Sequence, residues 1–313
     1  MKYSKPALSI KDQLLKLISK GLQVADEPMA KEWLSCIGYY RLSAYAYIFK
    51  TQPSRRQFKM GSTFEQILRI YEFDRELRLL VNDAVERCEI AIRSNIVNVT
   101  AIALGSHWFM EPRHFIPGYP ITGLQRKIEE AVGVRMNPAT NRKSYPTKHS
   151  ETFISHYYTK YSDPELPPIW MTAETLSFGV LSRLYACFAD PKIQKEIAAP
   201  FGVHPTVFQQ WLQSLSYLRN LCAHHSRLWN RTFSVPPKIA KKHKGIIPAP
   251  DRFYAFAVVL FDLLKSINCG TEWALRLDSL IARFPEIDPV AMGFPANWKA
   301  EPFWDFPSIP SPP

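Results

Sequence analysis

The stretch TFEQILRIYEFDRELRLLVNDAVERCEIAIRSNIVNVTAIAL, residues 63–104, carries the strongest helical signal in the chain and contains neither proline nor glycine. Its apolar residues recur at steps of three, four and seven, as in a helix that buries one face. They are Phe64, Ile67, Leu68, Tyr71, Leu77, Leu80, Val81, Val85, Cys88, Ile92 and Ile96. At about 1.5 Å per residue an unbroken helix would span on the order of 60 Å, so we expect a bend or break within it and an end at Gly105.

Three shorter helices are predicted before this stretch. Ser9 starts the first as a capping residue, and the apolar stripe that follows stops at Gly21. Asp26 starts the second, which ends before Gly38, and the sequence from Tyr39 indicates a third.

The segment 111–168 has a different composition, with many Pro, Gly, Asn, Ser and Thr residues. Only residues 125–132 and 151–158 within it have a helical pattern. We interpret this segment as an irregular insertion with short helices. Helical periodicity resumes near Trp170, and Gly179 is expected to break the helix that follows.

The remaining sequence predicts further helices and no run of alternating, strand-like residues. The predicted fold class is therefore all-α, a helical bundle formed by one domain. Its parts are an N-terminal helical region of about residues 5–60, a core of 61–285 that includes the insertion 111–168, and a Pro-rich tail of 286–313. Within the core, further helices are expected after Asp190-Pro191, from Thr206 to Cys222, and over 251–268 and 272–283.

Charge and cysteine content narrow the functional class. The net charge is +11 and the sequence pI is about 9.4, which favours a polyanionic partner, with nucleic acid first and an anionic membrane surface second. The five cysteines are scattered and form no CxxC pair, so neither a disulfide framework nor a zinc site is indicated. No signal peptide and no stretch of 18 uncharged apolar residues is present, so we expect a cytoplasmic protein without a membrane anchor.

The motif SYLRNLCAHH, residues 216–225, combines Arg219, Asn220, His224 and His225 at the end of an amphipathic helix. A cation in the last helical turn interacts favourably with the helix dipole, which accounts for one such residue but not for all of them. The structural alternative is a network that caps the helix and holds the following segment, SRLWNR.

The functional alternative is RNA cleavage without a metal ion. A histidine titrates near neutral pH and can move the proton of a ribose 2′-hydroxyl or of the leaving oxygen. Arg219 would stabilise the phosphate as charge builds up, and Asn220 would position one of the reacting groups. We find no metal-binding motif and no Gly-rich phosphate loop, so no cofactor is predicted.

Several segments together resemble the Abi-like abortive-infection family, the AbiD/AbiF group of phage-defence proteins. These segments are LLKLISKGLQVAD with IGYYRLSAYAYIF, then IYEFDRELRLLVNDAVERCEIAIRSNI, LPPIWMTAETLSFGVLSRLY and LRNLCAHHSRLWNR. The resemblance covers most of residues 5–270 in the family order. It implies a likeness to HEPN-type ribonucleases, whose signature is Arg, often a polar residue, and a His after four to six intervening residues.

Arg219, Asn220 and His224 fit that signature, and His225 fits it with one more intervening residue. We favour His224 as the acid or base because it shares a helix face with Asn220. Because the HEPN cleft usually contains two copies of the motif, the resemblance implies a homodimer, or a partner that completes the site. It also implies a toxin that is restrained by an antitoxin, or by a bound structured noncoding RNA.

Other residues are assigned from local pattern alone. Glu89 and Arg93 are expected to form a structural i,i+4 salt bridge, and Trp170 and Trp211 to lie in the core. Candidate RNA contacts are the aromatic and basic residues Tyr40 and Arg41 and the loop cations Arg55, Arg56, Lys59, Lys238, Lys241, Lys242 and Lys244. The main alternative function is a non-catalytic protein that binds a specific structured RNA, and a third is nucleotidyl transfer with a nucleotide-binding partner.

Overall fold

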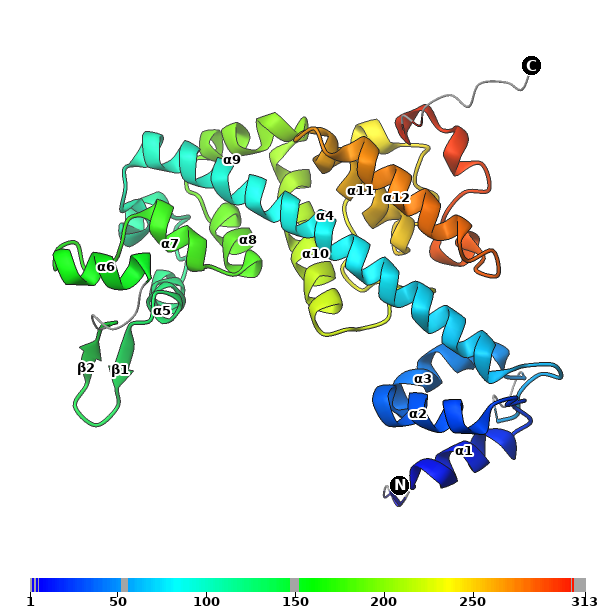
Figure 1. Ribbon diagram of the computed structural model, residues 1–313. Helices are drawn as coiled ribbons and strands as arrows, with labels where there is room; N and C mark the ends of the chain where they lie inside the picture. The colour runs from blue at the N-terminus through cyan, green and yellow to red at the C-terminus, as the bar shows by residue number, and fades with distance from the viewer. Residues whose placement is uncertain are drawn as a thin grey trace.

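A single long helix organises the molecule. The computed structural model describes residues 2, 4, 6–51, 56–146, 152–304 and 306, and within them α4 runs without interruption from Phe64 to Leu104. Thr63 and Gln66 cap its start reciprocally, and Gly105 ends it. Of the bend or break expected within it, the break is wrong, because neighbouring helices pack along the length of α4 and support one continuous helix (Figure 1).

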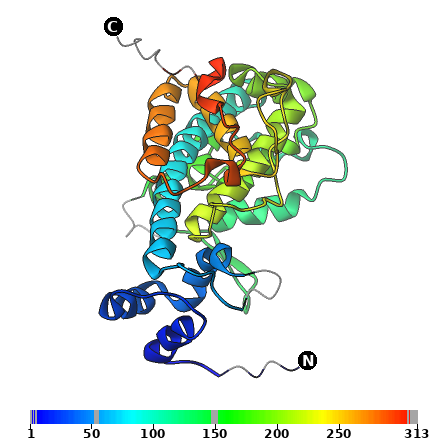
Figure 2. The ribbon, with the colours of Figure 1, turned by 90° about the vertical axis from the view of Figure 1, so that its right-hand side faces the viewer.

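Eleven further α-helices are present in the described residues, and α3 and α7–α12 pack against α4. Their bounds are α1 Ile10–Ile18, α2 Glu27–Ile37, α3 Tyr39–Ala46, α5 Ile121–Ala131, α6 Phe153–Lys160, α7 Ile169–Thr175, α8 Phe178–Ala186, α9 Pro191–Ala198, α10 Pro205–Ala223, α11 Phe253–Lys265 and α12 Gly270–Ala282. Helices α1–α3 lie at the N-terminal end of α4, and α7–α9 lie toward its C-terminal end (Figures 1 and 2). The all-α prediction is confirmed.

Helix α11 is the centre of the hydrophobic core. Every residue from Phe253 to Phe261 is fully buried, as expected for a helix that is apolar on all sides. It packs against α4 and α12. The segment after α12 also contributes, because Trp298 and Trp304 of the sequence-predicted tail are buried and Trp304 stacks on Phe261.

The insertion is confirmed as irregular, with one feature that the sequence did not indicate. Strands β1 (Arg135–Asn137) and β2 (Arg142–Ser144) form a small antiparallel hairpin. Asn137 accepts hydrogen bonds from the N–H groups of two turn residues through its side chain, and Asn141 adopts a φ of 51°. Because its strand residues are mostly exposed, the hairpin has no alternating apolar pattern.

Two local predictions in the next segment are wrong. The helix break predicted between Leu176 and Leu181 is present, but it lies at Leu176 and Ser177, where the backbone is extended, and not at Gly179, which is inside α8. Gly179 instead allows close packing, since a Cβ there would lie 3.2 Å from Ser216 Oγ on α10. Trp170 is 49% exposed because other residues of α7 face the core, whereas Trp211 is buried as predicted.

Within the part of the chain that the structure describes, no helix is both long enough and apolar enough to span a bilayer.

Candidate functional site

The end of α10 sets the geometry of the Arg219–His225 motif. The N–H of Ser226 donates to Leu221 O at 2.8 Å, and that of His225 donates to Cys222 O at 2.9 Å. This pair of bonds is a Schellman motif, in which the residue at the position of His225 is usually glycine. His225 has a φ of 54°, a left-handed conformation that costs a non-glycine residue about 1 kcal/mol or more. His224 and His225 therefore have different backbone conformations, and their imidazoles project from the helix end in different directions.

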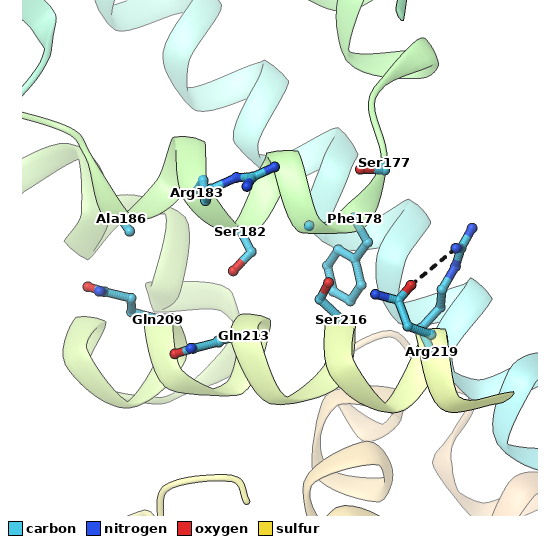
Figure 3. A pocket seen from close by; sticks show the side chains of 11 residues that line it. Ser177, Phe178, Ser182, Arg183, Ala186, Gln209, Gln213, Ser216 and Arg219 are labelled. Carbon is cyan, nitrogen blue, oxygen red and sulfur yellow. Dashed lines mark hydrogen bonds between the residues drawn. The ribbon is translucent and has the colours of Figure 1, made fainter. Parts of the chain in front are cut away.

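The four motif side chains are exposed to solvent. Arg219 Nη1 lies 3.5 Å from Asn220 Oδ1, at the upper limit of a hydrogen bond (Figure 3). Within the described residues, neither side chain bonds to the following segment, so the predicted capping network is not formed by these two residues.

That following segment is held instead by Asp74 of α4. Its carboxylate is completely buried and accepts hydrogen bonds from the N–H groups of Leu228 (3.0 Å) and Trp229 (2.6 Å). Tyr45 of α3 donates to the same carboxylate at 2.7 Å, and Arg78 pairs with it one turn further along α4. Burial raises the pKa of Asp74, and the charge of Arg78 and the hydrogen bonds offset part of that effect. We call this cluster the Asp74 network.

The sequence pattern did not lead to a prediction of the Asp74 network, although it contains a signal for it. Asp74 and Arg78 are four residues apart and fall on the apolar stripe of α4 between Tyr71 and Val81. Charged residues on a buried helix face must pair with one another or with buried polar groups. Their partners, Tyr45 on α3 and the backbone after α10, cannot be predicted from the spacing of residues within one helix.

Arg41 is brought to the motif from α3. Its Nη1 donates to the backbone carbonyl of His225. The two residues line one hollow together with Arg75 and Arg78 of α4, and we call it the arginine hollow. No carboxylate of the described residues lines it. One sequence-predicted RNA contact and one predicted catalytic residue, 184 positions apart, thus lie side by side.

A second hollow lies between α4 and α10. Arg219 lines it from α10, and Asn82, Glu86 and Glu89 line it from α4. Because Asn82 also lines the arginine hollow, the two depressions adjoin. We call this the α4–α10 hollow.

The predicted Glu89–Arg93 ion pair is confirmed. The two side chains are 2.6 Å apart and largely buried. Arg93 also donates to the carbonyls of Ala173 and Leu176, the latter at 3.0 Å. Arg93 thereby provides hydrogen-bond donors to carbonyl groups at the C-terminal end of α7 and fixes that helix to α4. This is a structural role.

The third hollow lies between α8 and α10, and we call it the α8–α10 hollow (Figure 3). Arg219 and Asn220 form one end of it, while Gln209 and Gln213 line it from earlier turns of α10. Arg219 therefore separates this hollow from the α4–α10 hollow. His225 lines the arginine hollow, whereas His224 lines none of these three depressions.

As far as the chain is described, the other predicted RNA contacts line none of the three hollows. Arg55 lies outside the described residues, while Arg56 and Lys59 are exposed in the loop after α3, and Tyr40 is 91% exposed. The exposed residues Lys238, Lys241, Lys242 and Lys244 lie beside the N-terminal half of α10, where Trp211 Nε1 donates to Lys238 O at 2.7 Å. Lys242 pairs with Asp262 at 2.6 Å.

Cys222 has the properties of a core residue. It is 1% exposed, and burial raises the pKa of its thiol to about 12. It is therefore unsuited to act as a nucleophile near neutral pH. Among the described residues, no group of three His, Cys, Asp or Glu side chains is arranged to hold a metal ion.

Comparison with known proteins gives one assignment. Neither the curated protein sequences nor the solved structures contain a match to this chain. Residues 32–230, more than half of the 313-residue chain, match the family of Abi-like proteins. The matched region begins in α2 and includes Arg41, the Asp74 network and the whole Arg219–His225 motif. The chain therefore belongs to the Abi-like protein family.

Proposed function

We propose that this protein is an abortive-infection phage-defence protein of the AbiD/AbiF group and a HEPN-type ribonuclease that cleaves RNA without a metal ion. The observation that carries the proposal is the position of Arg219 between two adjoining hollows, with His224 and His225 at the end of the same helix. These side chains are exposed and available to a substrate. The net charge of +11 supports a polyanionic substrate.

The reaction needs one base, one acid and one fixed cation. A neutral imidazole of His224 or His225 removes the proton of a ribose 2′-hydroxyl, and the oxygen attacks the adjacent phosphorus. Arg219 neutralises the charge that builds up on the phosphoryl oxygens, with Asn220 as a further donor. The bond to the 5′-oxygen breaks and that oxygen receives a proton from an imidazolium. The products carry a 2′,3′-cyclic phosphate and a 5′-hydroxyl.

The hollows also support action as a homodimer. Within one chain, Arg219 and His225 line different depressions. A second copy that faces the first would add its own arginine and histidine to the phosphate that is cleaved. Leu79 and Ile90 of α4 are more than half exposed; Leu79 lines the arginine hollow and Ile90 lines the α4–α10 hollow, so this face offers apolar contacts to an interface. Restraint by an antitoxin or by a structured noncoding RNA is part of the same proposal.

The test is cleavage of labelled total RNA in EDTA by the wild type and by Arg219→Ala, His224→Ala and His225→Gly. Glycine suits the left-handed position of His225, so this substitution removes the imidazole and keeps the helix end. We expect cyclic-phosphate ends from the wild type and a loss of about 100-fold or more in Arg219→Ala and in the variant of the acting histidine. His156→Ala, at an exposed position of α6, is the matched control and should retain full activity.

The alternative of a non-catalytic RNA-binding protein predicts a different result. In that case the wild type leaves labelled RNA intact and co-purifies with one discrete RNA. Affinity then falls steeply with salt and is almost unchanged in the histidine variants. Such a result would refute the ribonuclease proposal for the isolated protein.

A further inference from the structure

The α8–α10 hollow has a lining that differs from the rest of the motif surface. Three carboxamides line it from α10, those of Gln209, Gln213 and Asn220, and three serine hydroxyls lie among them. Among the residues that the structure describes, Arg183 and Arg219 are the only charged ones that line it, and no carboxylate does so. Its volume of about 460 Å³ is in the range of small-ligand sites.

Within the described residues, the side-chain amides of Gln209 and Gln213 form no hydrogen bonds that hold the fold together, in contrast to that of Gln210. Gln210 lies outside the hollow and its amide donates to Pro236 O at 3.4 Å, which ties α10 to the following loop. Gln209 and Gln213 are one helical turn apart and exposed, and neither makes a side-chain hydrogen bond to another described residue. Both line the hollow from α10 (Figure 3).

The floor of the hollow is apolar. Phe178 is 1% exposed, and its ring lies between α8 and α10 (Figure 3). Gly179 lies beside it and lacks the Cβ that would meet Ser216 Oγ at 3.2 Å. An apolar floor surrounded by hydrogen-bond donors and acceptors suits a ligand that is planar and carries hydrogen-bonding edges.

We propose that the α8–α10 hollow binds a nucleobase of single-stranded RNA and gives the protein a base preference. Carboxamides and guanidinium groups form paired hydrogen bonds with base edges. The Watson–Crick edges are free in single strands and paired in duplexes. The nucleotide is the one beside the phosphate at Arg219, because that side chain forms the end of the hollow. This inference rests on the proposed action on RNA, but base selection and cleavage can be measured separately.

The experiment measures binding of labelled RNA hexamers in which every ribose is 2′-O-methylated, so that cleavage cannot occur. One hexamer contains uridine alone, and three others carry A, C or G at alternate positions. We expect the tightest and weakest hexamers to differ by about fivefold or more in Kd with the wild type, the lower limit for one well-formed paired contact. In Gln209→Ala/Gln213→Ala the four Kd values should agree within about twofold.

The control is Gln57→Ala, an exposed glutamine in the loop after α3, which should keep the wild-type ratio. Alanine is a better helix former than glutamine, so the double variant should fold, and circular dichroism checks this. Equal binding of the four hexamers by the wild type, or an unchanged ratio in the double variant, overturns the proposal. A base preference that the double variant loses supports it even if the wild type does not cleave RNA, in which case only the ribonuclease proposal fails.

Discussion

Asp74→Ala should destabilise the protein severely. The substitution removes the acceptor of two backbone N–H groups, at 3.0 Å and 2.6 Å, and of the Tyr45 hydroxyl at 2.7 Å. It also leaves the guanidinium of Arg78, 6% exposed, without its carboxylate. Loss of one partner of a buried ion pair costs about 3–5 kcal/mol, so we expect the free energy of unfolding to fall by about that amount.

Urea denaturation at pH 7, followed by circular dichroism, measures this loss. Asp83→Ala is the matched control on the same helix, because Asp83 pairs with Arg87 at 3.2 Å and Arg276 at 2.8 Å but is 31% exposed. Its cost should be about 0–1 kcal/mol. The double variant Asp74→Leu/Arg78→Met leaves no buried charge and should be more stable than Asp74→Ala alone. Equal costs for Asp74→Ala and Asp83→Ala would refute the assignment of Asp74 as a buried anchor.

Two further predictions concern titratable groups. Burial raises the pKa of Cys222 to about 12, so roughly one thiol in 10,000 is ionised at pH 8. In the native protein, iodoacetamide should therefore react with the exposed Cys36 and leave Cys222 unlabelled. Equal labelling rates at the two cysteines would contradict this prediction. Burial alone would raise the pKa of Asp262, but contacts with His243 and Lys242 outweigh it and leave the pKa below its ordinary value. This stabilisation is present above about pH 4 and is lost as pH falls through the lowered pKa, so Asp262→Asn should be less stable than wild type at pH 7, with a gap that narrows as the pH falls below about 4. A gap independent of pH would contradict it.

Local signals in the sequence were sufficient for most helix boundaries. Thr63 and Gly105 act as the start and end of α4, and Ser9, Asp26 and Gly38 have the same roles in α1 and α2. Each of these signals depends on backbone groups within about four residues, which is the range that a sequence pattern contains. The same local rule failed at Gly179, where contact with α10 explains the glycine.

The motif was readable from the sequence, but its surroundings were not. Arg219, Asn220 and the two histidines lie together in one short segment. Arg41 reaches the carbonyl of His225 from 184 positions away, and this contact depends on how α3 packs at the end of α4. The left-handed backbone at His225 was also hidden, because glycine is the usual signal for such a helix end and histidine is not.

The structure separates the residues that hold the motif from those that face solvent. Asp74 is buried and fixes the chain just after the helix end, whereas Arg219 and the two histidines are exposed and make few contacts with the fold. Substitution of an exposed side chain of this kind changes stability little, so a loss of activity there reports on chemistry or binding. Substitution at Asp74 must lower activity through loss of structure. A variant with full stability and no activity can therefore arise at the end of α10 but not in the Asp74 network, and this difference allows mutagenesis to test the proposed roles separately.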